Sequence, residues 1–66
     1  MKFWIARDEY GSLYLYDNIP VKRRMYFEPQ RGYDTMKLDD RLFPKVTFNN
    51  SPQEVELKLV KKNEQE

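Results

Sequence analysis

Two short runs of strand-forming residues, separated by one tight turn, constrain this chain more than any other feature. Phe3–Ala6 enters the turn and Leu13–Tyr16 leaves it, and both runs are rich in aromatic and aliphatic side chains. Between them, Asp8 and Gly11 stand at the first and fourth positions of Asp8-Glu9-Tyr10-Gly11. That pattern suits a type I turn followed by a glycine in the left-handed region. The stretch from Phe3 to Tyr16 is therefore predicted to be a β-hairpin.

The turn geometry also predicts the register of this hairpin. The expected cross-strand partners are Arg7 with Leu13, Ala6 with Tyr14, Ile5 with Leu15, and Trp4 with Tyr16. Cross-strand partners lie on the same side of a sheet. One side, the aliphatic face, then carries Phe3, Ile5, Leu13 and Leu15, and the other, the aromatic face, carries Trp4, Ala6, Tyr14 and Tyr16. Two interpretations of the aromatic face stay open: a packing surface covered by the rest of the chain, or a partly exposed recognition surface.

The chain is 66 residues long, which is near the lower limit for one self-supporting core. Aromatic residues make up 15% of it, and they supply the large side chains that a small core requires. We expect residues 1–62 to form a single small β domain and residues 63–66 to be a frayed C-terminal tail. A chain of this size is also compatible with a homodimer, because a second copy would complete its core.

Three further segments follow the hairpin. Lys22–Glu28 alternates imperfectly and predicts a strand with Met25 and Phe27 directed inward. Pro29–Gly32 predicts a corner, because proline suits the second turn position and glycine tolerates a positive φ. Tyr33–Leu38 predicts a weaker strand at an edge of the sheet, or partly a loop.

The last third of the chain predicts short elements. Asp39–Phe43, with an acidic cap and Pro44 after it, predicts one helical turn whose Leu42 and Phe43 close one end of the core. Val46–Phe48 predicts a short strand. Ser51–Glu54 has the form of a helix start, but the alternation of Val55, Leu57 and Leu59 favours a strand over Val55–Lys61.

Together these segments predict an all-β fold. The expected architecture is a small antiparallel sheet, or a partly closed barrel, of about five short strands with one short helical turn near Asp39–Phe43.

The composition argues against catalysis. The chain has no histidine and no cysteine, which removes the commonest general base, the usual activation of serine, and thiolate or imidazole metal ligands. Asp39-Asp40 is expected to cap a helical turn rather than hold a metal, and Ser12 and Ser51 are expected to serve turns. Gly11 and Gly32 are isolated, without a phosphate-binding pattern. We therefore expect no enzymatic activity, no cofactor and no metal site.

The sequence also predicts the surroundings of the protein. It shows neither the basic segment and apolar run of a signal peptide nor an apolar stretch of membrane-spanning length. The lack of cysteine is compatible with a reducing compartment. We expect a soluble, cytoplasmic protein that does not bind membranes.

Positive charge is concentrated in the middle of the chain. Val21–Lys37 has five basic and two acidic residues, a net charge of +3, within a chain of net charge +1. Basic and aromatic residues interleave there in the manner of single-stranded nucleic acid surfaces, where cations follow phosphates and bases stack on rings. The residues concerned are Lys22, Arg23, Arg24, Tyr26, Phe27, Arg31 and Tyr33. The alternative is that the cations protect an edge strand from aggregation while the rings pack.

Several motifs also resemble one group of proteins. They are Trp4-Ile5-Ala6-Arg7, the acidic-glycine turn, Leu13-Tyr14-Leu15-Tyr16, Leu42-Phe43-Pro44-x-Val46-Thr47-Phe48, and Ser51-Pro52-Gln53-Glu54-Val55-Glu56-Leu57. They resemble very small uncharacterised proteins encoded by phages and mobile elements of gut bacteria. The resemblance spans both ends of the chain and leaves Val21–Lys37 largely uncovered. It implies an accessory protein that binds a partner and does not catalyse.

These observations lead to two functional hypotheses. The first is a protein-binding accessory module that modulates a host factor through its aromatic surface and an exposed strand edge. The second is a weak RNA or single-stranded DNA binder, and an uncharacterised structural domain is a further alternative. The partner-binding residues predicted for these hypotheses are Trp4, Tyr14, Tyr16, Lys22, Arg23, Arg24, Tyr26, Arg31 and Tyr33.

Overall fold

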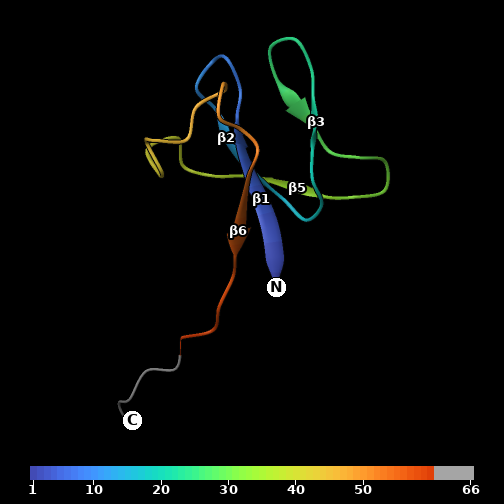
Figure 1. The fold of residues 1–66 in the computed structure, drawn as a ribbon, viewed down its shortest axis with the longest axis vertical. Helices are drawn as coiled ribbons and strands as arrows, with labels where there is room; N and C mark the ends of the chain where they lie inside the picture. The colour runs from blue at the N-terminus through green and yellow to red at the C-terminus, as the bar shows by residue number, and fades with distance from the viewer. Residues whose placement is uncertain (61–66) are drawn as a thin grey trace.

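A computed structural model of the chain describes residues 1–60, and these residues form an all-β fold without a helix. Its strands are β1 (Lys2–Arg7), β2 (Leu13–Tyr16), β3 (Val21–Lys22), β4 (Phe27–Glu28), β5 (Thr35–Lys37) and β6 (Gln53–Glu56). Four of them make an antiparallel sheet in the order β5-β2-β1-β6, and β3 and β4 make a separate two-stranded sheet (Figure 1). The prediction of a small antiparallel sheet is confirmed. The sheet is open, not a partly closed barrel, and the described residues hold six strands where about five were expected.

The predicted hairpin is the centre of the larger sheet. β1 and β2 pair in the expected register, with Trp4 opposite Tyr16 and Arg7 opposite Leu13. Gly11 has a φ of 94°, and its N–H donates to the Asp8 carbonyl over 3.2 Å. Asp8 Oδ1 closes the turn by accepting from the N–H groups of Tyr10 and Ser12, each at 2.9 Å. The turn therefore fixes the register, because an extra residue is accommodated only where glycine tolerates a positive φ.

Each face of this hairpin packs against a different part of the chain. On the aliphatic face, Ile5 and Leu13 form a buried cluster with Val46. On the aromatic face, Ala6 and Tyr16 form a second buried cluster with Phe27 of β4. The predicted division of the hairpin into two faces is thus confirmed. It separates two small cores, one on either side of a single sheet.

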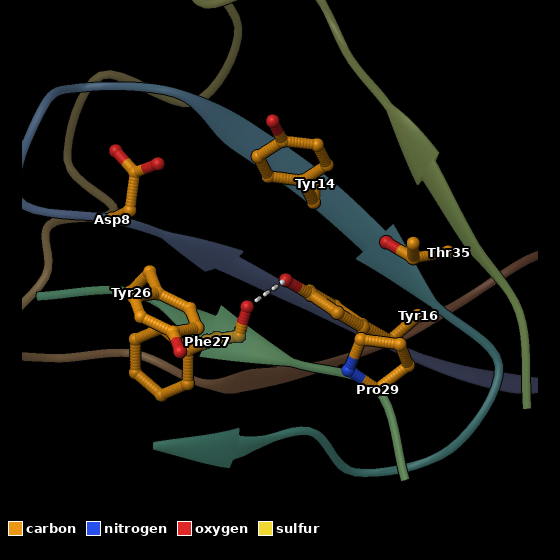
Figure 2. A pocket seen from close by; sticks show the side chains of 7 residues that line it. All are labelled: Asp8, Tyr14, Tyr16, Tyr26, Phe27, Pro29 and Thr35. Atoms are coloured by element: carbon orange, nitrogen blue, oxygen red, sulfur yellow. Dashed lines mark hydrogen bonds between the residues drawn. The ribbon is translucent and has the colours of Figure 1, made fainter. Parts of the chain in front are cut away.

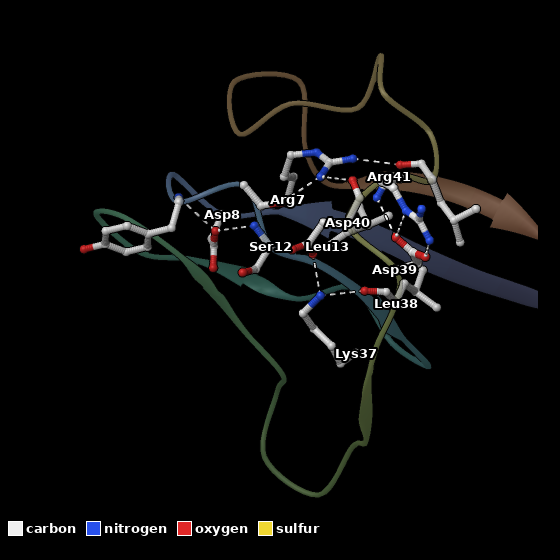
Figure 3. Close-up of polar contacts among 12 residues, drawn as sticks. Arg7, Asp8, Ser12, Leu13, Lys37, Leu38, Asp39, Asp40 and Arg41 are labelled. Atoms are coloured by element: carbon white, nitrogen blue, oxygen red, sulfur yellow. Dashed lines mark hydrogen bonds and ion pairs between the residues drawn. The ribbon is translucent and has the colours of Figure 1, made fainter.

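Arg7 holds the loop that supplies Val46. Its guanidinium donates to five backbone carbonyls, at distances from 2.6 to 3.2 Å, and Figure 3 shows part of this set around Arg7 and Asp40. The acceptors are the carbonyl oxygens of Gly11, Asp40, Leu42, Phe43 and Val46. Because Arg7 stands on the aliphatic face, these bonds fix residues 40–46 over that face and bring Val46 into the core.

The predicted strand over Lys22–Glu28 is wrong. This segment folds back on itself as the hairpin β3–β4, with Val21 opposite Glu28 and Lys22 opposite Phe27. The Arg23 N–H donates to the Tyr26 carbonyl over 2.8 Å across a turn at Arg24-Met25. The turn contains no glycine and no residue of positive φ, so nothing local in the sequence marks it. As a result Phe27 is buried as predicted, while Met25 at the tip is 39% exposed.

Two predictions for the last third of the chain are also wrong. Asp39–Phe43 is a hydrogen-bonded turn rather than a helical turn, with the Leu42 N–H donating to the Asp39 carbonyl over 3.1 Å. Leu42 and Phe43 are 45% and 52% exposed, so they do not close the core. Val46–Phe48 is not a strand. The bonds from Arg7 to this segment's carbonyls compete with helical and strand pairing, and Val46 takes the place in the core that Leu42 and Phe43 were expected to fill.

Both edges of the large sheet come from the second half of the chain. β5 lies at one edge, as predicted for Tyr33–Leu38. The corner before it is present one residue later than predicted: the Tyr33 N–H donates to the Gln30 carbonyl over 3.0 Å, and Gly32 has a φ of 89°. β6 forms the other edge, so the final element is a strand, as predicted. It runs over Gln53–Glu56, so only Val55 and Glu56 of the predicted strand Val55–Lys61 belong to it, and Lys61 lies outside the described residues. The predicted tail at 63–66 and the domain end at 62 lie outside the described residues.

Candidate functional site

The most exposed part of the sheet is the outer edge of β5. The Asp17 N–H donates to the Asp34 carbonyl and the Leu38 N–H to the Leu13 carbonyl, so these two pairs lie on hydrogen-bonded positions of the β2–β5 ladder. Hydrogen-bonded pairs alternate with non-bonded pairs along an antiparallel ladder. The backbone groups of Thr35 and Lys37 therefore point away from β2, toward an edge that no strand of residues 1–60 occupies.

A hollow of about 160 Å³ lies on the aromatic face beside this edge (Figure 2). We call it the aromatic hollow. Figure 2 shows rings from β2 and from the β3–β4 hairpin around it, with a carboxylate at one end. It is lined by Asp8, Tyr14, Tyr16, Tyr26, Phe27, Pro29 and Thr35.

A second hollow, of about 190 Å³, lies on the opposite side of the same strand. We call it the aliphatic hollow, and it is lined by Phe3, Leu15, Asp17, Asp34, Thr35 and Met36. It occupies the half of the aliphatic face that residues 40–46 leave uncovered, where Met36 is 56% exposed. Thr35 lines both hollows, so the free edge of β5 lies between them.

Size and charge limit what these hollows can hold. Both are smaller than the roughly 300–1,000 Å³ of pockets that enclose a whole small molecule, so each fits a single side chain better. The aromatic hollow contains one carboxylate, from Asp8, and the aliphatic hollow contains two, from Asp17 and Asp34. No basic side chain is among the residues that line either hollow. The two sites therefore suit neutral or cationic groups and disfavour phosphates.

Three of the predicted site residues meet in the aromatic hollow, namely Tyr14, Tyr16 and Tyr26. Tyr16 is buried, its hydroxyl donates to the Phe27 carbonyl over 3.3 Å, and burial raises its pKa. This bond ties the sheet to β4. The Tyr14 and Tyr16 rings are tilted by 51° with centroids 6.4 Å apart. Trp4 is half-buried on the same face but does not line the hollow.

The predicted basic residues do not gather in one place. Lys22 Nζ lies 4.5 Å from the Phe48 ring centroid and 5.8 Å from that of Phe27, so it covers the aromatic core. Arg23 is paired with Glu28 at 3.1 Å, which raises the pKa of Arg23 and lowers that of Glu28. Two of the predicted cations therefore have structural contacts within the chain.

The remaining basic and aromatic residues lie toward opposite ends of the β3–β4 hairpin. Arg24 is at its tip, next to Met25, whose carbonyl accepts from the N–H of the acidic residue Glu9 over 2.9 Å. Arg31 and Tyr33 follow the other end of the hairpin, in the loop before β5 (Figure 1). A continuous strand over Lys22–Glu28 followed by a turn would have placed Arg31 and Tyr33 beside Arg24 and Tyr26, and that strand is absent.

Asp39 and Asp40 have structural roles as the sequence suggested, although not at a helix. Asp40 Oδ1 accepts from the Leu13 N–H over 3.2 Å and is paired with Lys37, and these contacts lower the pKa of Asp40, the Lys37 contact most (Figure 3). Asp39 is paired with Arg41 at 2.7 Å and accepts from its N–H, which lowers the pKa of Asp39. Over residues 1–60, no group of three or more acidic side chains is arranged to hold a metal ion.

The lining of the aromatic hollow includes Asp8, Thr35 and Pro29, none of which was predicted as a site residue from the sequence. Asp8 was assigned to the turn, which it does close, but its side chain also borders the hollow. The predicted edge position of Tyr33–Leu38 was the one available signal for Thr35. The position of Pro29 depends on the unrecognised turn at Arg24-Met25, which brings β4 back over the sheet.

Comparison with known proteins finds no matching family model, no matching curated protein and no matching solved structure. The fold and the two hollows define the protein as a small all-β domain with an open strand edge. Its function must therefore be argued from this geometry.

Within the part of the chain that the structure describes, no helix has the length and apolar character needed to cross a membrane.

Proposed function

We propose that this chain is a non-enzymatic protein-binding accessory module that captures an extended segment of a partner protein at the free edge of β5. The observation that carries the proposal is the position of Thr35, which stands on an unpaired edge and lines a hollow on each side of the sheet. A strand that adds to such an edge directs successive side chains to opposite faces.

When a segment binds by strand addition, different contacts determine the affinity and the specificity of binding. Backbone hydrogen bonds to the outward groups of Thr35 and Lys37 would hold any extended segment, whatever its sequence. Selection would come from the side chains that alternate between the aromatic and the aliphatic hollow. Most of the aromatic hollow belongs to β2, β4 and the central turn, so a side chain of the added strand would reach only the end of the hollow at Thr35.

The other edge supports this choice of site. By the same alternation, the Leu57 N–H bond to the Met1 carbonyl makes Glu54 and Glu56 the outward residues of β6. Charged side chains at consecutive outward positions are a common means of preventing strand addition. β5 instead presents one uncharged residue, Thr35, and Lys37, which is paired with Asp40. On β6, Glu54 is paired with Lys2, and Glu56 makes no ion pair among residues 1–60.

The test compares proline at outward positions of the two edges. Thr35→Pro removes an outward N–H without removing a ladder bond to β2, so we expect capture of the partner from host extract to be lost while the fold is kept. Glu54→Pro makes the same change on β6 and is the matched control, and Thr35→Val controls for the hydroxyl that donates to the Leu15 carbonyl. Partner capture that survives Thr35→Pro, or is lost equally with Glu54→Pro, would contradict the proposal.

The alternative of a weak RNA or single-stranded DNA binder has less support. It requires the Lys22–Tyr33 cations to be free and adjacent, whereas Lys22 and Arg23 make contacts within the chain and both hollows contain carboxylates. Salt-sensitive oligonucleotide binding that falls when Arg23 and Arg24 are replaced by alanine would favour it. An origin in phages or mobile elements, modulation of a host factor, a cytoplasmic location and a homodimer remain predictions.

A further inference from the structure

We infer that the aromatic hollow binds the guanidinium group of an arginine carried by the partner protein, on a part that lies over the aromatic face beside the strand added to β5. This inference rests on the proposed function for the identity of the partner. The preference of the hollow for a cation rests on its own residues and can be tested without any partner.

The first argument is that only one of the two oxygens of the Asp8 carboxylate accepts hydrogen bonds from residues 1–60. Its Oδ1 accepts both N–H groups that close the central turn, which holds the side chain in one orientation at the end of the hollow. Its Oδ2 takes part in none of the hydrogen bonds or ion pairs of residues 1–60. An anionic oxygen at the wall of a hollow that no basic side chain lines favours a cation as the occupant.

The second argument is the ring system beside that carboxylate. Tyr14, Tyr16 and Tyr26 line the hollow, and tyrosine rings attract cations placed within about 6 Å of the centroid. One such contact exists inside the molecule, since Lys37 Nζ lies 5.6 Å from the Tyr14 centroid. Lys37 itself is paired with Asp40 and does not line the hollow. The Asp8 carboxylate and the rings that line the hollow can therefore bind a second cation.

The third argument concerns shape and reach. Asp8 follows β1, which is two strands in from β5, so a strand added to β5 would lie about 14 Å from it. That distance exceeds the reach of any side chain of the added strand. The cation must therefore come from a part of the partner that lies over the aromatic face. Arginine has a planar group that stacks on aromatic rings while donating hydrogen bonds to a carboxylate, so we assign arginine rather than lysine.

The experiment titrates the protein with N-acetyl-argininamide and follows the ring signals of Tyr14 and Tyr26 by NMR. We expect saturable shifts, and no binding by the citrulline analogue, which keeps the shape of arginine without its charge. Asp8→Asn keeps the acceptor that closes the turn but removes the charge, and should weaken binding about tenfold. Tyr26→Leu should also weaken it. The matched controls are Glu9→Gln and Tyr33→Leu, which change residues of the same kinds outside the lining of the hollow.

The outcomes separate this inference from the proposed function. Binding of argininamide that survives Thr35→Pro, together with loss of partner capture, supports both. Argininamide binding without strand addition at β5 supports the arginine site alone. Equal binding of citrulline, equal binding of the lysine analogue, or an Asp8→Asn protein that matches Glu9→Gln would overturn the arginine assignment, and strand addition at β5 would stand or fall separately.

Discussion

At the scale of single residues, Arg7 makes more hydrogen bonds to backbone groups than any other charged side chain among residues 1–60. A salt bridge on the surface contributes little, because water competes for both partners. Arg7 instead donates to five carbonyls of two loops, and its half-buried position limits that competition. It joins the central turn to the loop that delivers Val46.

Replacing Arg7 tests this role. We expect Arg7→Met to lower the free energy of unfolding by about 2 kcal/mol, because several carbonyls lose a charged donor at once. Arg41→Met is the matched control: Arg41 is exposed and pairs only locally with Asp39, so we expect a loss below about 0.5 kcal/mol. Urea unfolding followed by Trp4 fluorescence measures both. Equal losses in the two variants would show that the loop does not depend on Arg7.

The ionised Asp40 carboxylate makes the stability of the fold depend on pH. Lys37 and the Leu13 N–H lower the pKa of Asp40 below its unfolded value. A carboxyl group with a lowered folded pKa stabilises the fold above its unfolded pKa of about 3.9, and that contribution is lost as the pH falls through the folded pKa. We therefore expect the melting temperature to fall between about pH 5 and about pH 2.5.

The matched variant is Asp40→Asn, whose side-chain oxygen can still accept from the Leu13 N–H. It should be less stable than the wild type near pH 7, and the difference should narrow toward the acid end. Thermal unfolding monitored by circular dichroism across this range measures it. A difference that is constant with pH would argue against an ionised Asp40 as the cause.

At the scale of elements, the β3–β4 hairpin acts as a lid on the aromatic face. It is attached by the Phe27 ring, by the Tyr16 hydroxyl bond to the Phe27 carbonyl, and by the Glu9 N–H bond to the Met25 carbonyl. Its ladder has only two residue pairs. Since a turn without positive φ splays the strands that follow it, so short a ladder is the expected result, and packing must supply the rest.

The hairpin therefore should depend on Phe27 and not on Met25. We expect Phe27→Leu to cost about 1 kcal/mol of unfolding free energy and Met25→Leu less than about 0.5 kcal/mol. The reason is that Phe27 is 7% exposed and Met25 is 39% exposed. Chemical denaturation of both variants distinguishes this lid from the continuous strand predicted from the sequence, which would give the two substitutions similar costs.

At the scale of the whole molecule, the sheet is covered unevenly. The β3–β4 hairpin and Phe48 cover much of the aromatic face, and residues 40–46 cover one half of the aliphatic face. The other half of the aliphatic face and both sheet edges have no covering strand within residues 1–60. Sixty residues are enough to protect the centre of a four-stranded sheet but not its margins, and the proposed partner site lies at such a margin.

The sequence by itself determined the central hairpin, its register and its two faces. Those depend on interactions between neighbours: the alternation of side chains, the Asp8 side chain and the positive φ of Gly11. It also predicted that Tyr33–Leu38 would be a weak edge strand or partly a loop, and the strand β5 within it is at an edge and covers only Thr35–Lys37.

Only the tertiary structure decided the rest. The turn at Arg24-Met25, the replacement of Leu42 and Phe43 by Val46 in the core, and the meeting of Asp8 with Tyr26 all depend on contacts between distant residues. Arg7 makes such contacts with carbonyl groups, which every residue has and no sequence pattern marks. For this reason the register and faces of the central hairpin could be predicted from the sequence. The aromatic hollow, which combines the hairpin with β4 and β5, could not.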